Sequence, residues 1–151
     1  MIDPGLAQQL KEAGLEWQPT KRDNFMIPGG ELAKDVFSLN DQTILVENVK
    51  GQTTVTFHGS TEWALDDVLL ADIVWLPTET QLREAVQQQI AGDDGTLSLV
   101  WNADGYRCGL RRSDEEREFV GQTAEDAYGY ALLFLLRAAQ QERNRRWINT
   151  A

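Results

Sequence analysis

The sequence predicts an α+β domain in which antiparallel sheets carry helices on one face, ending in a C-terminal β-β-β-α unit. Two features of its order indicate this class: strand-like runs are grouped rather than alternating with helices, and short β-branched runs are separated by turn residues. The third observation is a long amphipathic pattern near the C-terminus. With 42% hydrophobic and 25% charged residues, the composition is ordinary for a folded domain.

The first element expected is a short N-terminal helix. Asp3 can cap its free N–H groups, and Pro4 loses nothing at the first helical position. Leu6 and Leu10 follow at helical spacing, and Gly14 is a natural residue to end the helix.

Short strands follow. Residues 25–27 predict a strand that stops at a Pro-Gly-Gly sequence, and residues 36–39 fit either a strand or one helical turn. The β-branched runs 43–49 and 53–57 are separated by Lys-Gly-Gln, which predicts a hairpin.

The stretch 62–76 is ambiguous, because its apolar residues suit a helix over most of its length and a strand at 73–76. Pro77 ends it in either case. Thr78 and Gln81 then form a capping-box pattern that predicts a helix closing at Gly92.

The C-terminal part predicts a three-stranded meander followed by a helix. The strands are expected at 97–101, 106–112 and 117–120, and Thr123 can cap a helix over 124–146. The apolar stripe that should face the sheet consists of Ala127, Ala131, Leu132, Leu135, Ala138 and Ala139.

A length of 151 residues favours a single domain, 1–151, with 1–91 and 92–151 as lobes sharing one core. Lys and Arg number 14 against 24 Asp and Glu, a formal charge of −10. Most of the excess lies in residues 1–91, with 6 basic and 14 acidic residues. A negative field repels phosphates and anionic lipids, so neither nucleic acid nor a membrane is an expected partner, whereas a basic protein surface is.

Cytoplasmic localisation is expected. The N-terminus shows neither the basic nor the apolar region of a secretory signal. The longest apolar run, 130–136, is far shorter than the roughly 20 residues that span a bilayer. The single Cys108 excludes an intramolecular disulfide and fits a reducing compartment.

The sequence offers little catalytic chemistry. It contains no phosphate-binding glycine loop, and one His with one Cys cannot form an ordinary Cys/His zinc site within one chain. Cys108 lies in the middle of a predicted strand, where a small buried thiol is expected. No catalytic residue, metal site or cofactor is therefore predicted.

The segment from residue 58 to 67 holds the densest group of functional residue types: His58, Glu62, Trp63, Asp66 and Asp67. A helix would place Glu62 and Asp66 on one face, where they and Asp67 could bind a hard cation. Acidic residues in a first helical turn are also explained by the helix dipole. We therefore predict these five residues as a ligand or partner surface.

Most of the chain resembles a family of small acidic bacterial proteins of unknown function. The resemblance rests on Thr61-Glu62-Trp63-Ala64-Leu65-Asp66 and on Trp75-Leu76-Pro77. Some members carry a label linking them to pilus assembly through an ATPase component. This chain has no ATP-binding loop, so it is not that ATPase.

About the last 55 residues of the chain are similar to HicB-type antitoxins. The similarity consists of three strands followed by Gly121-x-Thr123-x-Glu125-Asp126-Ala127. The resemblance implies a partial RNase H-like fold that binds a basic toxin. The Pro- and Cys-containing segment of that family is replaced here by Ser113-Asp114-Glu115-Glu116-Arg117.

The sequence therefore leads to two alternative hypotheses about function. The first is a non-catalytic protein that binds another protein as an adaptor, accessory or inhibitor. The alternative is a metal-dependent enzyme or a small-ligand-binding domain that uses Glu62, Asp66 and Asp67. The sequence predicts neither the partner nor the oligomeric state.

Overall fold

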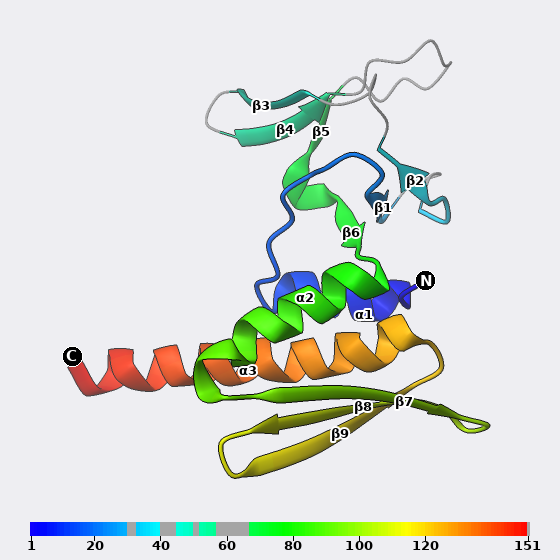
Figure 1. Cartoon of the computed structure of the whole chain (residues 1–151). Helices are drawn as coiled ribbons and strands as arrows, with labels where there is room; N and C mark the ends of the chain where they lie inside the picture. The colour runs from blue at the N-terminus through cyan, green and yellow to red at the C-terminus, as the bar shows by residue number, and fades with distance from the viewer. Residues whose placement is uncertain (30–32, 40–44, 50–51, 57–66, 151) are drawn as a thin grey trace. The chain divides into compact units, whose positions relative to one another are not determined.

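The structure, a computed structural model, describes residues 1–29, 33–39, 45–49, 52–56 and 67–150 (Figure 1). The chain divides into two compact units. Unit 1 consists of Met1–Glu16 and Pro77–Ala151, and unit 2 consists of Trp17–Leu76. The boundary considered from the charge distribution, between residues 91 and 92, falls inside unit 1, because a change of net charge does not mark where buried contacts end.

Helix α1 (Pro4–Glu12) opens unit 1 and has the expected cap. The Asp3 carboxylate accepts a hydrogen bond from the Leu6 N–H, and Pro4 occupies the first turn. Leu6, Ala7 and Leu10 are buried on one face. Gly14 follows the helix with a φ of 102°, a value at which glycine is favoured.

Helix α2 (Glu79–Ile90) begins with the predicted capping box. The Gln81 N–H donates to the Thr78 hydroxyl, and the Thr78 N–H donates to the Gln81 side chain. The buried face consists of Leu82, Val86 and Ile90. A 3₁₀ turn, Ala91–Asp93, ends at Asp94 with a φ of 51° and leads into the sheet.

The C-terminal sheet is an antiparallel meander of β7 (Thr96–Asn102), β8 (Gly105–Arg112) and β9 (Glu115–Gly121). The strands are longer than the sequence predicts, because each connecting turn contains only two residues. Leu97 pairs with Leu110, and Leu99 pairs with Cys108, which pairs in turn with Phe119. These residues share the apolar face of the sheet, where Cys108 and Leu110 are buried.

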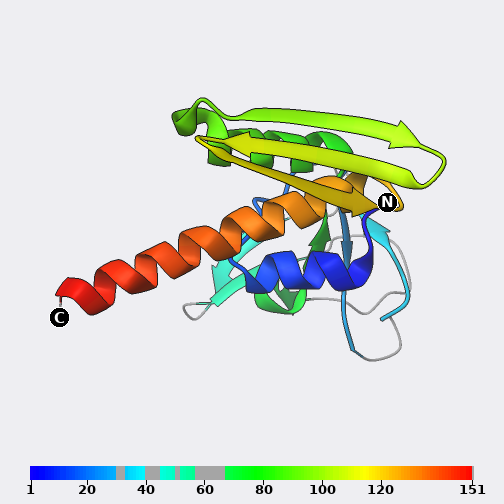
Figure 2. The same cartoon turned by 90° about the horizontal axis from the view of Figure 1, so that it is seen from below.

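Helix α3 (Ala124–Thr150) covers that apolar face. The Thr123 hydroxyl caps it by accepting from the Asp126 N–H at 3.1 Å. The helix packs on α1, α2, β8 and β9. Of the predicted stripe, Ala127, Ala131, Leu132 and Leu135 are buried, whereas Ala138 and Ala139 are only half-buried. Figure 2 shows that the C-terminal turns of α3 extend past the end of the sheet.

Helix α1 is attached to the N-terminal end of α3. The Asp3 N–H donates to Asp126 Oδ1 at 2.8 Å, and the Met1 ammonium lies 3.3 Å from the Glu125 carboxylate. Gly129 lets the two helices approach closely, since a Cβ built there would lie 2.8 Å from Leu6 Cδ2.

The described residues of unit 2 form two small antiparallel sheets. The first has the order β2-β1-β6, formed by β1 (Asn24–Met26), β2 (Phe37–Ser38) and β6 (Val74–Leu76). The second has the order β3-β4-β5, formed by β3 (Leu45–Val49), β4 (Gln52–Thr56) and β5 (Asp67–Leu69). The predicted hairpin is therefore confirmed as β3 and β4.

Within the stretch left ambiguous by sequence, residues 67–76 form β5, a 3₁₀ turn (Leu70–Asp72) and β6. The helical spacing of its apolar residues does not prevail, because β5 pairs with β4 and β6 pairs with β1.

Among the described residues, the core of unit 2 is aromatic and includes the buried carboxylate of Asp23. Phe25, Leu39 and Ile73 form a buried cluster against which Trp17 and Phe37 pack. Asp23, 3% exposed, accepts hydrogen bonds from the Trp17 indole at 2.9 Å and from the Thr20 N–H at 3.0 Å. Both bonds are accepted by Asp23 Oδ2, which therefore holds the loop that precedes β1.

The α+β class, the antiparallel sheets and the C-terminal β-β-β-α unit are confirmed. Among the described residues, no helix is both long enough and apolar enough to cross a membrane.

Candidate functional site

Most of the residue cluster predicted as a binding surface lies outside the described residues. His58, Glu62, Trp63 and Asp66 belong to the segment 57–66, and Asp67 opens β5 opposite Thr56. Cation binding by these carboxylates therefore stays a prediction. Among the described residues, no group of three or more His, Cys, Asp or Glu side chains is placed to hold a metal ion.

Cys108 is a structural residue. It lies in the central strand β8 with 0% of its surface exposed. Burial raises the pKa of the Cys108 thiol to about 11, because the thiolate would lose its hydration. A buried, protonated thiol is a poor nucleophile, so Cys108 fills the core, as the sequence indicates.

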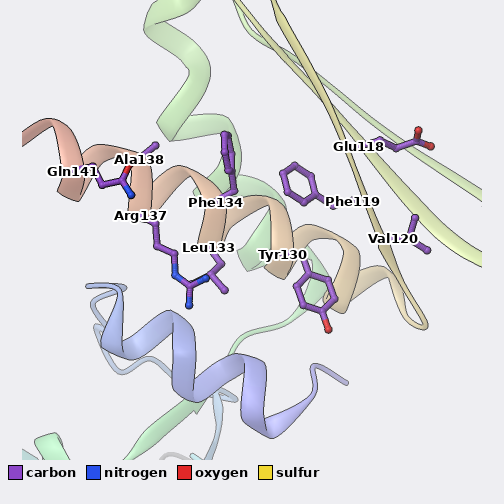
Figure 3. A pocket seen from close by; sticks show the side chains of 9 residues that line it. All are labelled: Glu118, Phe119, Val120, Tyr130, Leu133, Phe134, Arg137, Ala138 and Gln141. Carbon is purple, nitrogen blue, oxygen red and sulfur yellow. The ribbon is translucent and has the colours of Figure 1, made fainter.

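One concave surface of unit 1 is a groove of ≈ 560 Å³ between β9 and α3 (Figure 3). Strand β9 contributes residues 118–120, and α3 contributes residues from its middle turns. The lining consists of Glu118, Phe119, Val120, Tyr130, Leu133, Phe134, Arg137, Ala138 and Gln141. We refer to it as the β9–α3 groove.

The floor of the β9–α3 groove is aromatic. Figure 3 shows Phe119 of β9 and Phe134 of α3 pointing toward each other between strand and helix, and their ring centroids are 5.6 Å apart. The Arg117 guanidinium lies over the Phe134 ring, with its Cζ 4.5 Å from the ring centroid. Ring pairing and the cation–π contact both hold Phe134 in place.

The wall of the groove exposes apolar surface. Val120 is 48% exposed and Tyr130 is 42% exposed. Tyr130, Leu133 and Arg137 project from the same side of α3, as their spacing along a helix requires (Figure 3). An apolar wall with a polar rim is the usual form of a surface that binds another molecule.

The charge near the groove differs in sign from that of the whole chain. Glu118 is paired with Arg107 at 3.2 Å, whereas Arg137 forms no ion pair within the described part of the chain. Beyond the groove, α3 carries Arg143, Arg145 and Arg146 against the single acidic residue Glu142. The β9–α3 groove therefore opens next to a locally basic surface on a chain of net charge −10.

Another hollow, of ≈ 490 Å³, lies on the opposite face of the sheet, around Gly109. A Cβ at Gly109 would lie 2.5 Å from the Ser98 hydroxyl, so a larger residue there would require the Ser98 side chain to move. Its rim includes the paired Arg107 and Glu118. Because these charges already neutralise each other, this hollow is less suited to binding a ligand than the β9–α3 groove.

The sequence analysis did not predict the groove, because the groove lies between β9 and α3, which come together only in the folded chain. One signal was available in the apolar run 130–136, which covers more of the helix circumference than a single buried stripe needs. Tyr130 and Phe134 lie outside the predicted stripe, and both line the groove.

Comparisons of the chain with protein-family models, with curated proteins and with solved structures gave no match.

Proposed function

We propose that the protein is a non-catalytic protein-binding module, an adaptor or accessory protein, that holds an apolar segment of its partner in the β9–α3 groove. The observation that carries the proposal is the groove itself, an open apolar surface with an aromatic floor and a cationic rim. Aromatic and Arg side chains are the residue types most enriched where protein interfaces gain their binding energy.

The rim indicates what the bound segment contains. Arg137 stands beside Leu133 with no ion pair in the described part of the chain, so an acidic side chain of the partner can pair with it. The apolar neighbour of that acidic residue would pack against Tyr130, next to Phe119 of the groove floor. The partner segment is thus apolar with an Asp or Glu, although the charge of the whole chain favours a basic protein.

The test selects peptides from a random-sequence display library on the intact protein. Selected peptides should combine an aromatic or aliphatic residue with Asp or Glu. Tyr130→Ala and Arg137→Glu should each weaken their binding by about fivefold or more, since removing a central interface contact costs over about 1 kcal/mol.

Matched controls exist on the same chain. Val120→Ser should weaken binding, whereas Val36→Ser should not, because both valines are 48% exposed and only Val120 lines the groove. Arg145→Glu has the same charge change as Arg137→Glu on the same helix, outside the groove. Selected peptides that bind Tyr130→Ala and Arg137→Glu as tightly as the wild type would refute the proposal.

A further inference from the structure

The other edge of the C-terminal sheet is open. Strand β7 pairs only with β8 among the described strands, and Figure 2 shows it along the outer edge of the sheet of unit 1. Alternate residues of an edge strand direct their N–H and C=O groups away from the sheet, where another strand can pair with them.

Edge strands normally carry features that prevent such pairing, and the two edges of this sheet differ in this respect. Strand β9 carries Glu115, Glu116, Arg117 and Glu118. Strand β7 reads Thr-Leu-Ser-Leu-Val-Trp-Asn, seven residues without a charge or a proline. By the usual criteria, β9 is protected against strand addition and β7 is not.

The side chains of β7 are also less buried than those of the central strand β8. On the apolar face, Leu110 and Cys108 of the central strand are 4% and 0% exposed, whereas their partners Leu97 and Leu99 are only half-buried. Trp101 on the same face is 67% exposed. A strand added beside β7 would continue this face and cover these side chains.

The charges at the two ends of β7 indicate the occupant. Asp94 precedes the strand and Asp104 lies in the turn after it, both exposed and neither in an ion pair within the described residues. We propose that β7 binds an extended segment of another protein by strand addition, and that this segment has an apolar centre flanked by Lys or Arg. Its cations would lie near Asp94 and Asp104, and one of them could also stack on Trp101.

A second copy of this chain fits the edge less well. Antiparallel pairing of two β7 strands centred on Leu99 would place Asp94 of each copy opposite Asp104 of the other. Like charges directly opposite each other across a strand pair are destabilising, and each copy carries a net charge of −10. The inference concerns the edge away from the β9–α3 groove and does not rest on that groove binding anything.

The test uses the intact, isotope-labelled protein and a synthetic peptide of alternating Val and Thr with Lys at both ends. The peptide should shift the NMR signals of the β7 amides and slow their hydrogen exchange. The same peptide with Glu at both ends should bind more weakly.

Two double variants test the role of charge. Asp94→Asn with Asp104→Asn should weaken binding of the Lys-ended peptide about three- to tenfold at low salt, since two surface charge contacts are lost. Asn tolerates the positive φ of 51° at position 94. The control, Glu12→Gln with Glu84→Gln, removes the same charge from two helices and should leave binding unchanged. Tyr130→Ala should also leave it unchanged, which separates this edge from the groove.

The proposal is overturned if neither peptide protects the β7 amides, or if the Lys-ended and Glu-ended peptides bind equally well. It is also overturned if the β7 amides of the free protein become protected as its concentration rises, because the occupant would then be a second copy.

Discussion

Replacement of Leu132 by Ala tests whether α3 and the sheet form one core. Leu132 is 0% exposed in a helix that packs on α1, α2, β8 and β9. Truncating a buried Leu to Ala costs about 2–5 kcal/mol through lost apolar burial and the cavity left behind. That is a large part of the roughly 5–15 kcal/mol by which a domain is stable.

The assay is urea unfolding followed by circular dichroism. With a denaturant dependence of about 2 kcal/mol per molar urea, a loss of about 3 kcal/mol lowers the midpoint by about 1.5 M. Gln140→Ala, on the exposed side of the same helix, is the matched control and should change stability by less than about 0.5 kcal/mol. Leu132→Asp should leave unit 1 unfolded, because it buries an unpaired charge.

A Leu132→Ala midpoint indistinguishable from that of the Gln140→Ala control would refute this reasoning. It would mean that the stripe of α3 does not contribute to the core in solution.

Two further predictions concern buried polar groups. Asp23→Ala should destabilise unit 2 by about 2–4 kcal/mol, because it leaves the Trp17 indole and the Thr20 N–H without their acceptor. Asp23→Asn should cost less, because its amide oxygen can still accept. Equal unfolding midpoints for Asp23→Ala and the wild type would contradict this prediction. The pKa of Cys108 is higher in the folded chain, about 11 against 9.0, so its contribution to stability is complete below pH 9 and is lost as the pH rises toward 11. That loss approaches about 2–3 kcal/mol. Burial also raises the pKa of Tyr128, so the effect of the thiol is measured by comparing the wild type with Cys108→Ala. Between pH 9 and 11 the unfolding free energy of Cys108→Ala should fall less than that of the wild type. Equal falls in the two proteins would contradict the role given to the thiol.

The parts of the fold that the sequence predicts are those specified by neighbouring residues. Asp3 with Pro4, and Thr78 with Gln81, mark the starts of α1 and α2, because capping is decided within one helical turn. The meander follows from turn residues and from strand alternation. In each case the interaction that decides the structure lies within a few positions of the chain.

The parts that the sequence could not predict depend on distant pairs. Strand β1 pairs Phe25 with Trp75. Residues 73–76 suit a strand, but the helical spacing of the apolar residues before them competes with it until that partner is known. The division into two units likewise depends on which segments of the chain bury each other. No change of composition at residue 17 or 77 indicates these boundaries.

The candidate site shows the same limit. The β9–α3 groove exists because Phe119 and Phe134 meet across two elements. By contrast, the chemically richest segment of the sequence, around Glu62 and Asp66, is outside the described residues. Residue types alone pointed to carboxylates, whereas the packing of the described chain points to an apolar surface.

The insertion of unit 2 between α1 and α2 also sets the order in which the chain can fold during synthesis. Asp3 and Asp126, which join α1 to α3, are 123 positions apart. At about 5–20 residues per second, the ribosome needs on the order of ten seconds to make the interval between them. Throughout that time the apolar face of α1 has no α3 to pack on. Docking of α1 must therefore be a late event, and contacts of such long sequence separation slow folding.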